Sequence, residues 1–436
     1  MSGRTLKQLL DAISTASNAL LGDLGPEASE STVDSIQPLD LKAVDQNVVK
    51  TLVNASRELQ VLSQGPGQML SLMAFANQHL RLMLLQYHDT SSLGIILEFD
   101  IPSLVPMDGT AIGLSSLSER TGLLEDKLAR VLRYATTNFI FREPLAGHIA
   151  HTAASAALAR DPGFATFLRL VLVDLAPIAV ALPSACRQWP QSEAPDECGL
   201  NAAFNTGDRF FEWLSRDAGR QARFDAGMAG FSAASGDNGD RPQTIDVKAY
   251  PWGKKLTDGA KIVDVGGGSG HVSRALALAY PQFHVTVQDR PEAIAPSAQQ
   301  ANNPSNLSFQ AHDFFSTQPL YGADVYFLRQ IIHDWPRAES VAILRALIPA
   351  LKKGARVLIS EYTIVNERNP EDYHPVDDKL IRQMDLQMMA VFNSKERTAD
   401  EFAKLFALAD PKMRYSGSYQ APEDPKSCIF EAVWEG

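Results

Sequence analysis

Residues 261–291 constrain the fold of this chain more than any other segment. Their letters, KIVDVGGGSGHVSRALALAYPQFHVTVQDRP, predict a buried strand, a glycine turn, a helix, a second strand and a terminal acid. This order of elements is typical of a parallel sheet that binds a nucleotide-like ligand at the carboxyl ends of its strands. The first question is therefore which ligand the turn accepts.

The glycine turn departs from the dinucleotide fingerprint G-x-G-x-x-G. The sixth position is His271 when counted from Gly266, and Ser273 when counted from Gly268. The sequence instead has Asp264 before the turn, at the end of the strand. A carboxylate there would repel a pyrophosphate, but it suits a ligand that carries an ammonium and a sulfonium.

Three further residues predict the rest of the ligand. Asp289 closes the second strand, where an acid can accept hydrogen bonds from both ribose hydroxyls. In the string HDFF, Asp313 can accept from an adenine amino group while Phe314 packs on the ring. These features predict S-adenosyl-L-methionine as cofactor and S-adenosyl-L-homocysteine as product. The alternative is a glycine turn that only starts a helix, with an unrelated acid beside it.

The third strand run ends in FLRQIIHDWP, which places His333 and Asp334 on the rim where ligands bind in open α/β sheets. A neutral imidazole there can remove the proton of a phenol, and the phenolate can then attack the sulfonium methyl in line. Glu361 ends the fourth strand and Glu396 precedes a helix, so either can accept the second imidazole N–H. This reaction needs no metal, and none is predicted.

Apolar side chains near Glu396 predict a pocket for a flat aromatic substrate. The Met and Phe residues of 377–397 recur at helical spacing, which fits a pocket and an ordinary core equally well. Residues 223–235 offer a similar wall. The predicted substrate-binding residues are Phe224, Met228, Asp334, Trp335, Asp385, Met388, Met389 and Phe392.

Composition excludes several classes of function. The 436 residues include 40 basic and 51 acidic side chains, a net charge of −11 with no basic stripe, so binding to nucleic acid or to a membrane is not expected. Three cysteines without CxxC spacing argue against disulfides and a zinc site, and predict a reducing, cytoplasmic location. The most apolar run, 167–183, contains Arg169, Asp174 and Pro177 and predicts a buried helix pair broken at the proline.

The pattern of elements predicts an α/β protein with a Rossmann-like domain at its C-terminal end. The runs KIVDVG, FHVTVQD, ADVYFLR and ARVLISEY alternate with helical stretches and predict a parallel, doubly wound sheet. A helix–helix–ribbon order over 94–151 matches a winged helix, used here for packing or dimerisation because it lacks a basic stripe. The expected segments are 1–90 (helical extension), 91–160 (winged-helix-like dimerisation region), 161–243 (helical linker and substrate cap) and 244–436 (cofactor-binding domain).

In combination, several strings resemble one enzyme family: VDVGGGSGH, VQDRPE, HDFF, LRQIIHDW, ISEY and MDLQMMAVFNSKERTADEF. They resemble class I S-adenosylmethionine-dependent O-methyltransferases of the plant phenolic type. They look closer still to the fungal, sterigmatocystin-type enzymes that methylate aromatic polyketides. The resemblance implies methylation of a phenolic hydroxyl on a polyketide or related secondary metabolite, and a homodimer with interlocking N-terminal helices.

The resemblance also implies roles for single residues. His333 would be the general base, with Glu361 and Glu396 as its flanking acids. The implied cofactor-binding residues are Asp264, Gly266, Gly268, Asp289, Arg290, Asp313, Phe314 and Arg329. The string NSKER departs from the plant pattern, in which a glycine commonly precedes the lysine, and this departure predicts an altered loop over the substrate.

Two other functions stay open. A pericyclase on the same scaffold would bind the cofactor without transferring its methyl group, but it would not need the combination of His333, Glu361 and Glu396. A winged-helix regulator with a vestigial enzyme domain would bind DNA in a salt-dependent way. The mass of the product separates the first of these from a methyltransferase.

Overall fold

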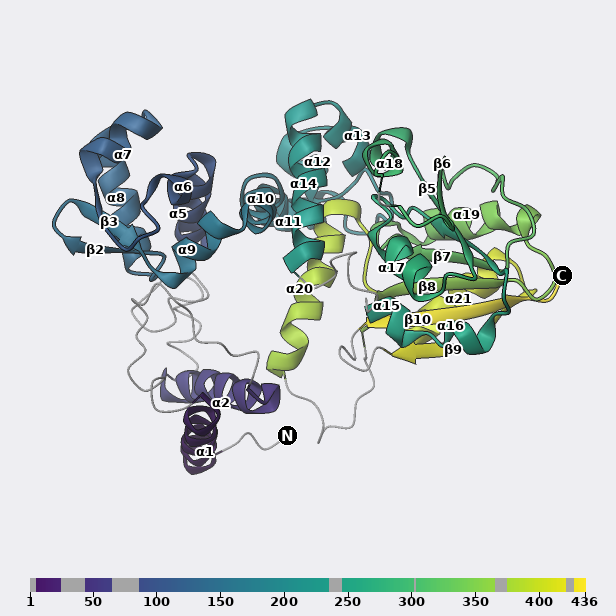
Figure 1. The fold of residues 1–436 in the computed structure, drawn as a ribbon, viewed down its shortest axis with the longest axis horizontal. Coiled ribbons are helices and arrows are strands. Elements are labelled where there is room, and N and C mark those ends of the chain that lie inside the picture. The colour runs from purple at the N-terminus through teal and green to yellow at the C-terminus, as the bar shows by residue number, and fades with distance from the viewer. Residues whose placement is uncertain are drawn as a thin grey trace. The chain divides into compact units, whose positions relative to one another are not determined.

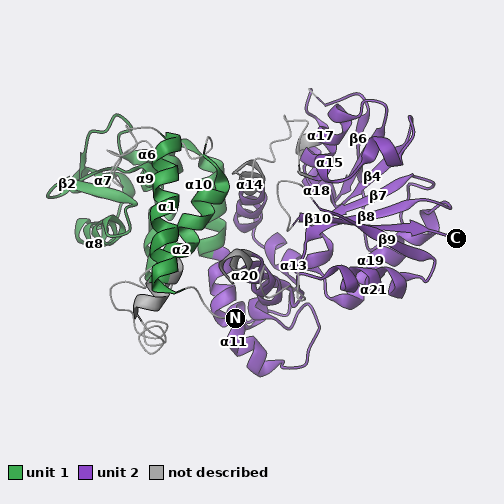
Figure 2. Cartoon of the chain, turned by 90° about the horizontal axis from the view of Figure 1, so that it is seen from below, with its two compact units in different colours: residues 1–173 green, residues 174–436 purple. Residues whose placement is uncertain are grey.

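The computed structural model describes residues 5–24, 44–64, 86–234, 245–301, 303–364, 375–420 and 427–436. The chain divides into two compact units, residues 1–173 and 174–436 (Figure 2). All predicted site residues belong to the second unit. The predicted segment boundary at 243/244 lies outside the described residues, and the division into four segments stays a prediction.

The first unit contains the predicted order of two helices and a ribbon. Gly122 ends the first of the two helices in a left-handed conformation, with φ of 72°. The second buries Leu128 and Leu132 on one face, where they join Phe141 of the ribbon in one apolar core. The elements of this unit are α1 (Leu6–Leu24), α2 (Gln46–Gln64), α5 (Gln86–Glu98), α6 (Ile101–Leu104), β1 (Ile112–Gly113), α7 (Leu114–Thr121), α8 (Glu125–Thr136), β2 (Phe141–Leu145), β3 (His148–His151), α9 (Ala153–Arg160) and α10 (Pro162–Arg169).

Among the described residues, Pro162–Gln188 is the one helix whose length and composition would allow it to cross a membrane. The prediction of a buried pair broken at Pro177 is wrong. The helix continues through a π-helical turn, Leu170–Leu175, and Pro177 falls in the first turn of α11 (Ala176–Gln188), where a missing N–H costs little. Only 17% of its apolar window is buried, and Val180 is 76% exposed. Length and composition alone do not place the helix in a membrane.

The second unit is built on a sheet of seven strands in the order β6-β5-β4-β7-β8-β10-β9 (Figure 1). Its strands are β4 (Lys261–Val265), β5 (His284–Asp289), β6 (Leu307–Ala311), β7 (Val325–Arg329), β8 (Arg356–Tyr362), β9 (Met413–Gln420) and β10 (Ser427–Trp434). The four predicted runs are confirmed as β4, β5, β7 and β8, which pair in parallel together with β6. The purely parallel sheet is wrong, because β10 pairs antiparallel with β8 and β9.

Helices cover both faces of this sheet because alternate strand residues face opposite sides. Ile262 and Phe327 pack with one group of helices, whereas Val263 and Leu328 pack with the other. The first group is α15 (Ile245–Ala249), α16 (Trp252–Lys255) and α17 (His271–Ala279), and the second is α19 (Arg337–Leu347) and α21 (Ala399–Ala409). The remaining helices are α12 (Gly199–Phe204), α13 (Phe210–Ser215), α14 (Ala218–Ala234), α18 (Pro291–Ala298) and α20 (Pro375–Phe392).

A buried acid on β10 ties α16 to the sheet. Glu431 has no exposed surface and accepts hydrogen bonds from Tyr250 at 2.8 Å and Tyr419 at 3.0 Å. Lys255 donates to it at 3.2 Å, and Arg356 also pairs with it. The carboxylate is therefore fully compensated by two hydroxyls and two cations.

Replacing Glu431 with alanine is expected to lower the free energy of unfolding by about 2–3 kcal/mol, because Tyr250 loses its acceptor inside the protein. Both cations keep some contact with water, which limits the loss. Urea denaturation followed by circular dichroism measures it. Glu435→Ala is the control: Glu435 is 60% exposed and makes a 3.8 Å ion pair, so less than about 0.5 kcal/mol is expected. Equal effects of the two variants would contradict the assignment.

Candidate active site

The glycine turn joins β4 to α17 at the carboxyl edge of the sheet, as predicted. Gly266, Gly268 and Gly270 have φ angles of 77°, 55° and 74°, a conformation that residues with side chains rarely adopt. A Cβ at Gly266 would meet Ile331 Cδ1 at 2.6 Å, whereas a Cβ at Gly268 would meet no described atom within 4 Å. The backbone at Gly268 is therefore open to the close approach of a ligand.

The carboxylate of Asp264 lies against the turn. Its Oδ2 accepts a hydrogen bond of 2.6 Å from Ser273 on α17, and it fills the place that a side chain at Gly267 would need. Its Oδ1 has no hydrogen-bond partner among the described residues, and burial raises the pKa of Asp264 to about 6. The residue thus shapes the turn and still offers one oxygen to a cationic group.

Asp289 holds the same turn from the end of β5. Its Oδ2 accepts from the N–H of Gly268 at 2.8 Å, and its Oδ1 accepts from the N–H of Arg290 at 2.7 Å. Burial raises the pKa of this carboxyl group above its usual value. Each oxygen keeps lone pairs for further donors, so Asp289 can accept the two hydroxyls of a ribose.

The other predicted cofactor residues lie at neighbouring strand ends. Asp313 follows β6 and accepts from the N–H of Phe315 at 3.0 Å. The ring of Phe314 meets that of Trp335 edge to face, with centroids 6.0 Å apart. The guanidinium of Arg290 lies 5.7 Å from the ring centroid of a phenylalanine that sequence analysis missed, Phe211.

Arg329, at the end of β7, is held by another residue that sequence analysis missed. Its Nε donates to Asp246 Oδ2 at 2.6 Å, and Asp246 on α15 is almost fully buried. Ser360 donates to the other carboxylate oxygen. No motif distinguishes Asp246 from other acids in short helices, so only the fold shows that it fixes Arg329.

His333 lies in a single 3₁₀ turn, Ile332–Asp334, directly after β7. Its Nδ1 is 2.9 Å from Glu396 Oε1 and 3.5 Å from Glu361 Oε2, and its Nε2 is 3.5 Å from Asp334 Oδ1. Both predicted acids thus lie beside Nδ1, and among the described residues the hydrogen bond of this nitrogen is to Glu396. A carboxylate on Nδ1 fixes the tautomer in which Nε2 is free to accept a proton.

Glu361 serves the backbone as well as the ring. Its Oε1 accepts from the N–H groups of Ile331, Ile332 and His333 at 3.0, 2.8 and 3.3 Å. Its Oε2 has no hydrogen-bond partner among the described residues, and the same holds for Glu396 Oε2. The buried carboxylates of Glu361 and Glu396 and the partly buried carboxylate of Asp334 therefore surround one imidazole.

This surplus of negative charge changes the proton affinity of the site. Burial alone would lower the pKa of His333, but the charges of Glu361 and Asp334 and the hydrogen bond to Glu396 raise it to about 10. Burial raises the pKa of Asp334 to about 7. In the absence of ligands, the imidazole is therefore expected to carry a proton near neutral pH.

Aromatic side chains connect the residues predicted for the cofactor with those predicted for the substrate. Phe211 on α13 lies 6.0 Å from Trp335, 6.2 Å from Phe224 and 5.8 Å from Phe392, between ring centroids. Phe210 packs against the last two at 5.5 and 5.0 Å. The string RFFEWL was the available signal for these two rings, but its aromatics alone do not separate a pocket from a core.

The remaining predicted substrate residues differ in their surroundings. Met388 packs on the cluster that contains Phe392, Met389 is half-buried, and Met228 is 36% exposed. Asp385 accepts from the backbone N–H of Glu396 at 2.9 Å, so it holds the loop of that acid in place. The Met stripe of α20 therefore serves partly as core.

Ligating atoms of His333, Glu361 and Glu396 lie within 4.8 Å of one another. The hydrogen bond between the imidazole and Glu396 accounts for this closeness without an ion. The absence of a metal stays a prediction.

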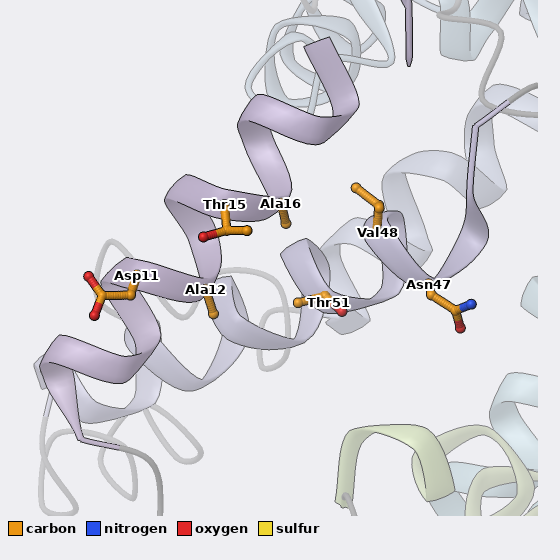
Figure 3. A pocket seen from close by; sticks show the side chains of 7 residues that line it. All are labelled: Asp11, Ala12, Thr15, Ala16, Asn47, Val48 and Thr51. Carbon is orange, nitrogen blue, oxygen red and sulfur yellow. The ribbon is translucent and has the colours of Figure 1, made fainter. Parts of the chain in front are cut away.

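A cavity of about 400 Å³ lies between α1 and α2, far along the chain from these residues (Figure 3). It is lined by Asp11, Ala12, Thr15, Ala16, Asn47, Val48 and Thr51. These side chains include one titratable group and none of the predicted site residues, so the cavity offers no acid–base pair for catalysis.

Comparison with known proteins gives the family directly. Residues 189–410 match a family described as "O-methyltransferase domain". Chlorophenol O-methyltransferase of Trichoderma longibrachiatum is 37% identical over 416 residues, which cover 94% of this chain and 85% of that protein.

Two solved structures share the fold over nearly the whole chain. OxaC in complex with S-adenosylhomocysteine (SAH) and oxaline has a TM-score of 0.77 at 22% identity, covering 98% of each chain. "A Pericyclic Reaction enzyme" has a TM-score of 0.71 at 21% identity, covering 97% of this chain and 99% of its own. Because likeness at this level extends to a pericyclic enzyme, the fold alone does not choose between the two reactions.

Proposed function

This chain belongs to the O-methyltransferase family, and on that premise we propose that it transfers a methyl group from S-adenosylmethionine to a phenolic hydroxyl, with His333 as the general base. The observation that carries the proposal is the imidazole of His333, placed after β7 with Glu396 on Nδ1, so that Nε2 is the nitrogen that would receive the phenol proton. Flanking carboxylates stabilise the imidazolium that forms when the phenol loses its proton.

The residues around the glycine turn fit the cofactor. Gly268 has open space above its backbone, Asp289 keeps lone pairs on both oxygens, and one buried oxygen of Asp264 has no partner in the described part of the chain. Gly268 would approach the methionine part, Asp289 would hold the ribose, and Asp313 and Phe314 would hold the adenine. When bound, the cofactor supplies an electrophilic methyl group on a cationic sulfur.

A phenol or fused-ring phenolic natural product is the acceptor class that the site favours. Phe211 packs against Phe224, Phe392 and Trp335, and Trp335 follows the base by two residues, so this aromatic cluster is the apolar surface that would contact the acceptor ring. The relative from Trichoderma longibrachiatum takes its name from chlorophenol, which is a small phenol. Aromatic side chains stack on such rings, and positioning of this kind supplies much of the rate of a transfer reaction. A homodimer and a cytoplasmic location stay predictions from the sequence.

Incubation of the protein with S-adenosylmethionine and a panel of phenolic polyketides, read by mass spectrometry, tests the proposal. A gain of one methylene by the acceptor, together with one S-adenosylhomocysteine per turnover, is expected. Turnover that persists after dialysis against EDTA supports the predicted absence of a metal. An isomer of unchanged mass would instead identify a pericyclase.

The pH dependence of kcat/KM gives a finer test through Asp334. Asp334→Asn removes a negative charge 3.5 Å from Nε2, and that charge raises the pKa of His333. Since the base must lose its proton before it can act, the rising limb of the profile is expected to move to lower pH, by about one unit. Initial rates measured between about pH 6 and 10 show the shift.

The control for this shift is Asp400→Asn, which removes an exposed carboxylate from the first turn of α21 in the same unit. Its profile is expected to match that of the unmodified protein. A limb that stays in place or moves to higher pH in Asp334→Asn would contradict the role of this charge.

A further inference from the structure

The turn that carries His333 is clamped by an arginine that no motif singled out. Arg397 is 2% exposed and lies directly after Glu396. Its Nη1 donates to the carbonyl of Ile332 at 2.8 Å, and its Nη2 donates to the carbonyl of Trp335 at 2.7 Å. The planar guanidinium thus binds the two carbonyls that flank residues 333 and 334.

Arg397 and Glu361 bind complementary backbone groups of this turn. The carboxylate of Glu361 accepts the N–H groups at the start of this turn, while the guanidinium donates to carbonyls within it and after it. The turn also follows a strained residue, since Gln330 has a φ of 54°. The buried side chains of Glu361 and Arg397, which have opposite charges, therefore hold the backbone of this turn in place after the unfavourable conformation of Gln330.

The backbone of Arg397 is anchored in turn to the end of β8. Its carbonyl accepts from the N–H of Ile364 at 3.3 Å and from the hydroxyl of Thr363 at 3.1 Å. Glu361 lies on β8, which ends at Tyr362, the residue before Thr363. Arg397 thus joins the strand of one flanking acid, the loop of the other and the turn of the imidazole.

We propose that Arg397 is a positioning residue that sets the distance and angle between His333 Nδ1 and Glu396. It acts through the backbone of the turn and does not touch the reacting atoms. Two successive residues position the imidazole: Glu396 accepts a hydrogen bond from the ring, and Arg397 binds the backbone of the turn that carries His333. This inference rests on the proposed function for its effect on turnover, but its geometric content can be measured without a substrate.

The test is Arg397→Lys, which keeps the positive charge but cannot donate to both carbonyls in one plane. A looser turn weakens the contact between Nδ1 and Glu396, so kcat is expected to fall about 10-fold while KM for the phenol stays within about 2-fold. The charged groups that face the ring are Asp334, Glu361 and Glu396, with Arg397 behind the turn. A weaker hydrogen bond to Glu396 lowers the pKa of His333, so the rising limb moves to lower pH.

The same shift is measured without turnover by NMR titration of the His333 imidazole, assigned by its loss in a His333 variant. A lower midpoint in Arg397→Lys than in the unmodified protein supports the proposal, even if the acceptor gains no methyl group and the proposed function fails. An unchanged midpoint overturns it. A fall in kcat that is proportional to the loss of cofactor-binding protein also overturns the proposal, because loss of folded enzyme explains such a fall.

Arg345→Lys is the matched control. Arg345 also donates to two backbone carbonyls, Ala409 at 3.2 Å and Leu408 at 2.9 Å, but these end α21 away from His333. It is expected to leave the midpoint and kcat unchanged. If Arg397→Lys does not fold, Ser340→Ala replaces it, since Ser340 donates to the same Trp335 carbonyl at 2.8 Å. A smaller shift in the same direction supports the proposal, and no shift overturns it.

Discussion

Replacing His333 with alanine is expected to reduce kcat/KM for methyl transfer by about 10²–10⁴-fold, the usual contribution of a general base. Nε2 is the ring atom free to take the phenol proton, because Nδ1 is 2.9 Å from Glu396. Without the imidazole, the small ionised fraction of the phenol itself supplies the nucleophile. The loss should therefore shrink as the pH rises toward the pKa of the acceptor, which a pH series measures.

Cofactor affinity separates this effect from a damaged fold. Isothermal titration of His333→Ala with S-adenosylhomocysteine is expected to give a Kd within about 3-fold of the unmodified protein, since the glycine turn does not depend on the imidazole. His284→Ala is the control, because His284 is exposed at the start of β5. Near-normal methyl transfer by His333→Ala, with binding intact, would rule out the proposed base.

Replacing Asp289 with alanine is expected to raise the Kd for the cofactor by about 10²–10³-fold. Two effects add: the ribose loses its acceptor, and the N–H of Gly268 loses the carboxylate that holds the turn at 2.8 Å. Each charge-assisted hydrogen bond contributes about 1.5–3 kcal/mol, and two of them near the lower end, about 3–4 kcal/mol together, correspond to this range. Calorimetry with S-adenosylhomocysteine measures the change directly.

Asp289→Asn divides these contributions. Its amide oxygen can still accept from Gly268, but it lacks the charge, so an intermediate Kd is expected. Asp410→Asn serves as control, because the side chain of Asp410 accepts from the backbone N–H of Lys412 after α21. An unchanged cofactor affinity in Asp289→Ala would contradict the hypothesis that Asp289 binds the ribose and holds the glycine turn for the cofactor.

The parallel part of the sheet could be predicted because its strands are buried on both faces and therefore consist of continuous apolar runs. β9, with the letters MRYSGSYQ, lies at the sheet edge and alternates between half-buried and exposed residues, so it lacks such a run. The predicted break in the apolar helix 162–188 was wrong, because it was inferred from single residues. Proline and aspartate within it suggested a break, but Asp174 lies in a π-helical turn and Pro177 in the first turn of α11, and the helix continues.

In the site, the groups with distinctive chemistry could be predicted from the sequence, whereas the groups that only hold them in place could not. His333 and Glu396 follow from the position of one histidine on a sheet rim and of an acid before a helix, and the structure brings them together. Arg397 and Asp246 act through contacts with backbone or with a second charge, and such contacts depend on residues far apart in the chain. Phe211 could not be distinguished from other aromatic residues in the sequence, because its contacts are also with residues far apart in the chain.

The strand that carries Glu361 has a neighbour on each side, because the terminal hairpin covers what would otherwise be its free edge. Interior strands of this kind are the last part of a domain to exchange their amide protons, since they open only when the domain unfolds as a whole. Glu361, which accepts three backbone N–H groups at the turn that carries the base, thus lies on an interior strand of the sheet. Local unfolding of peripheral helices during turnover is therefore expected to leave the position of His333, the proton acceptor, unchanged.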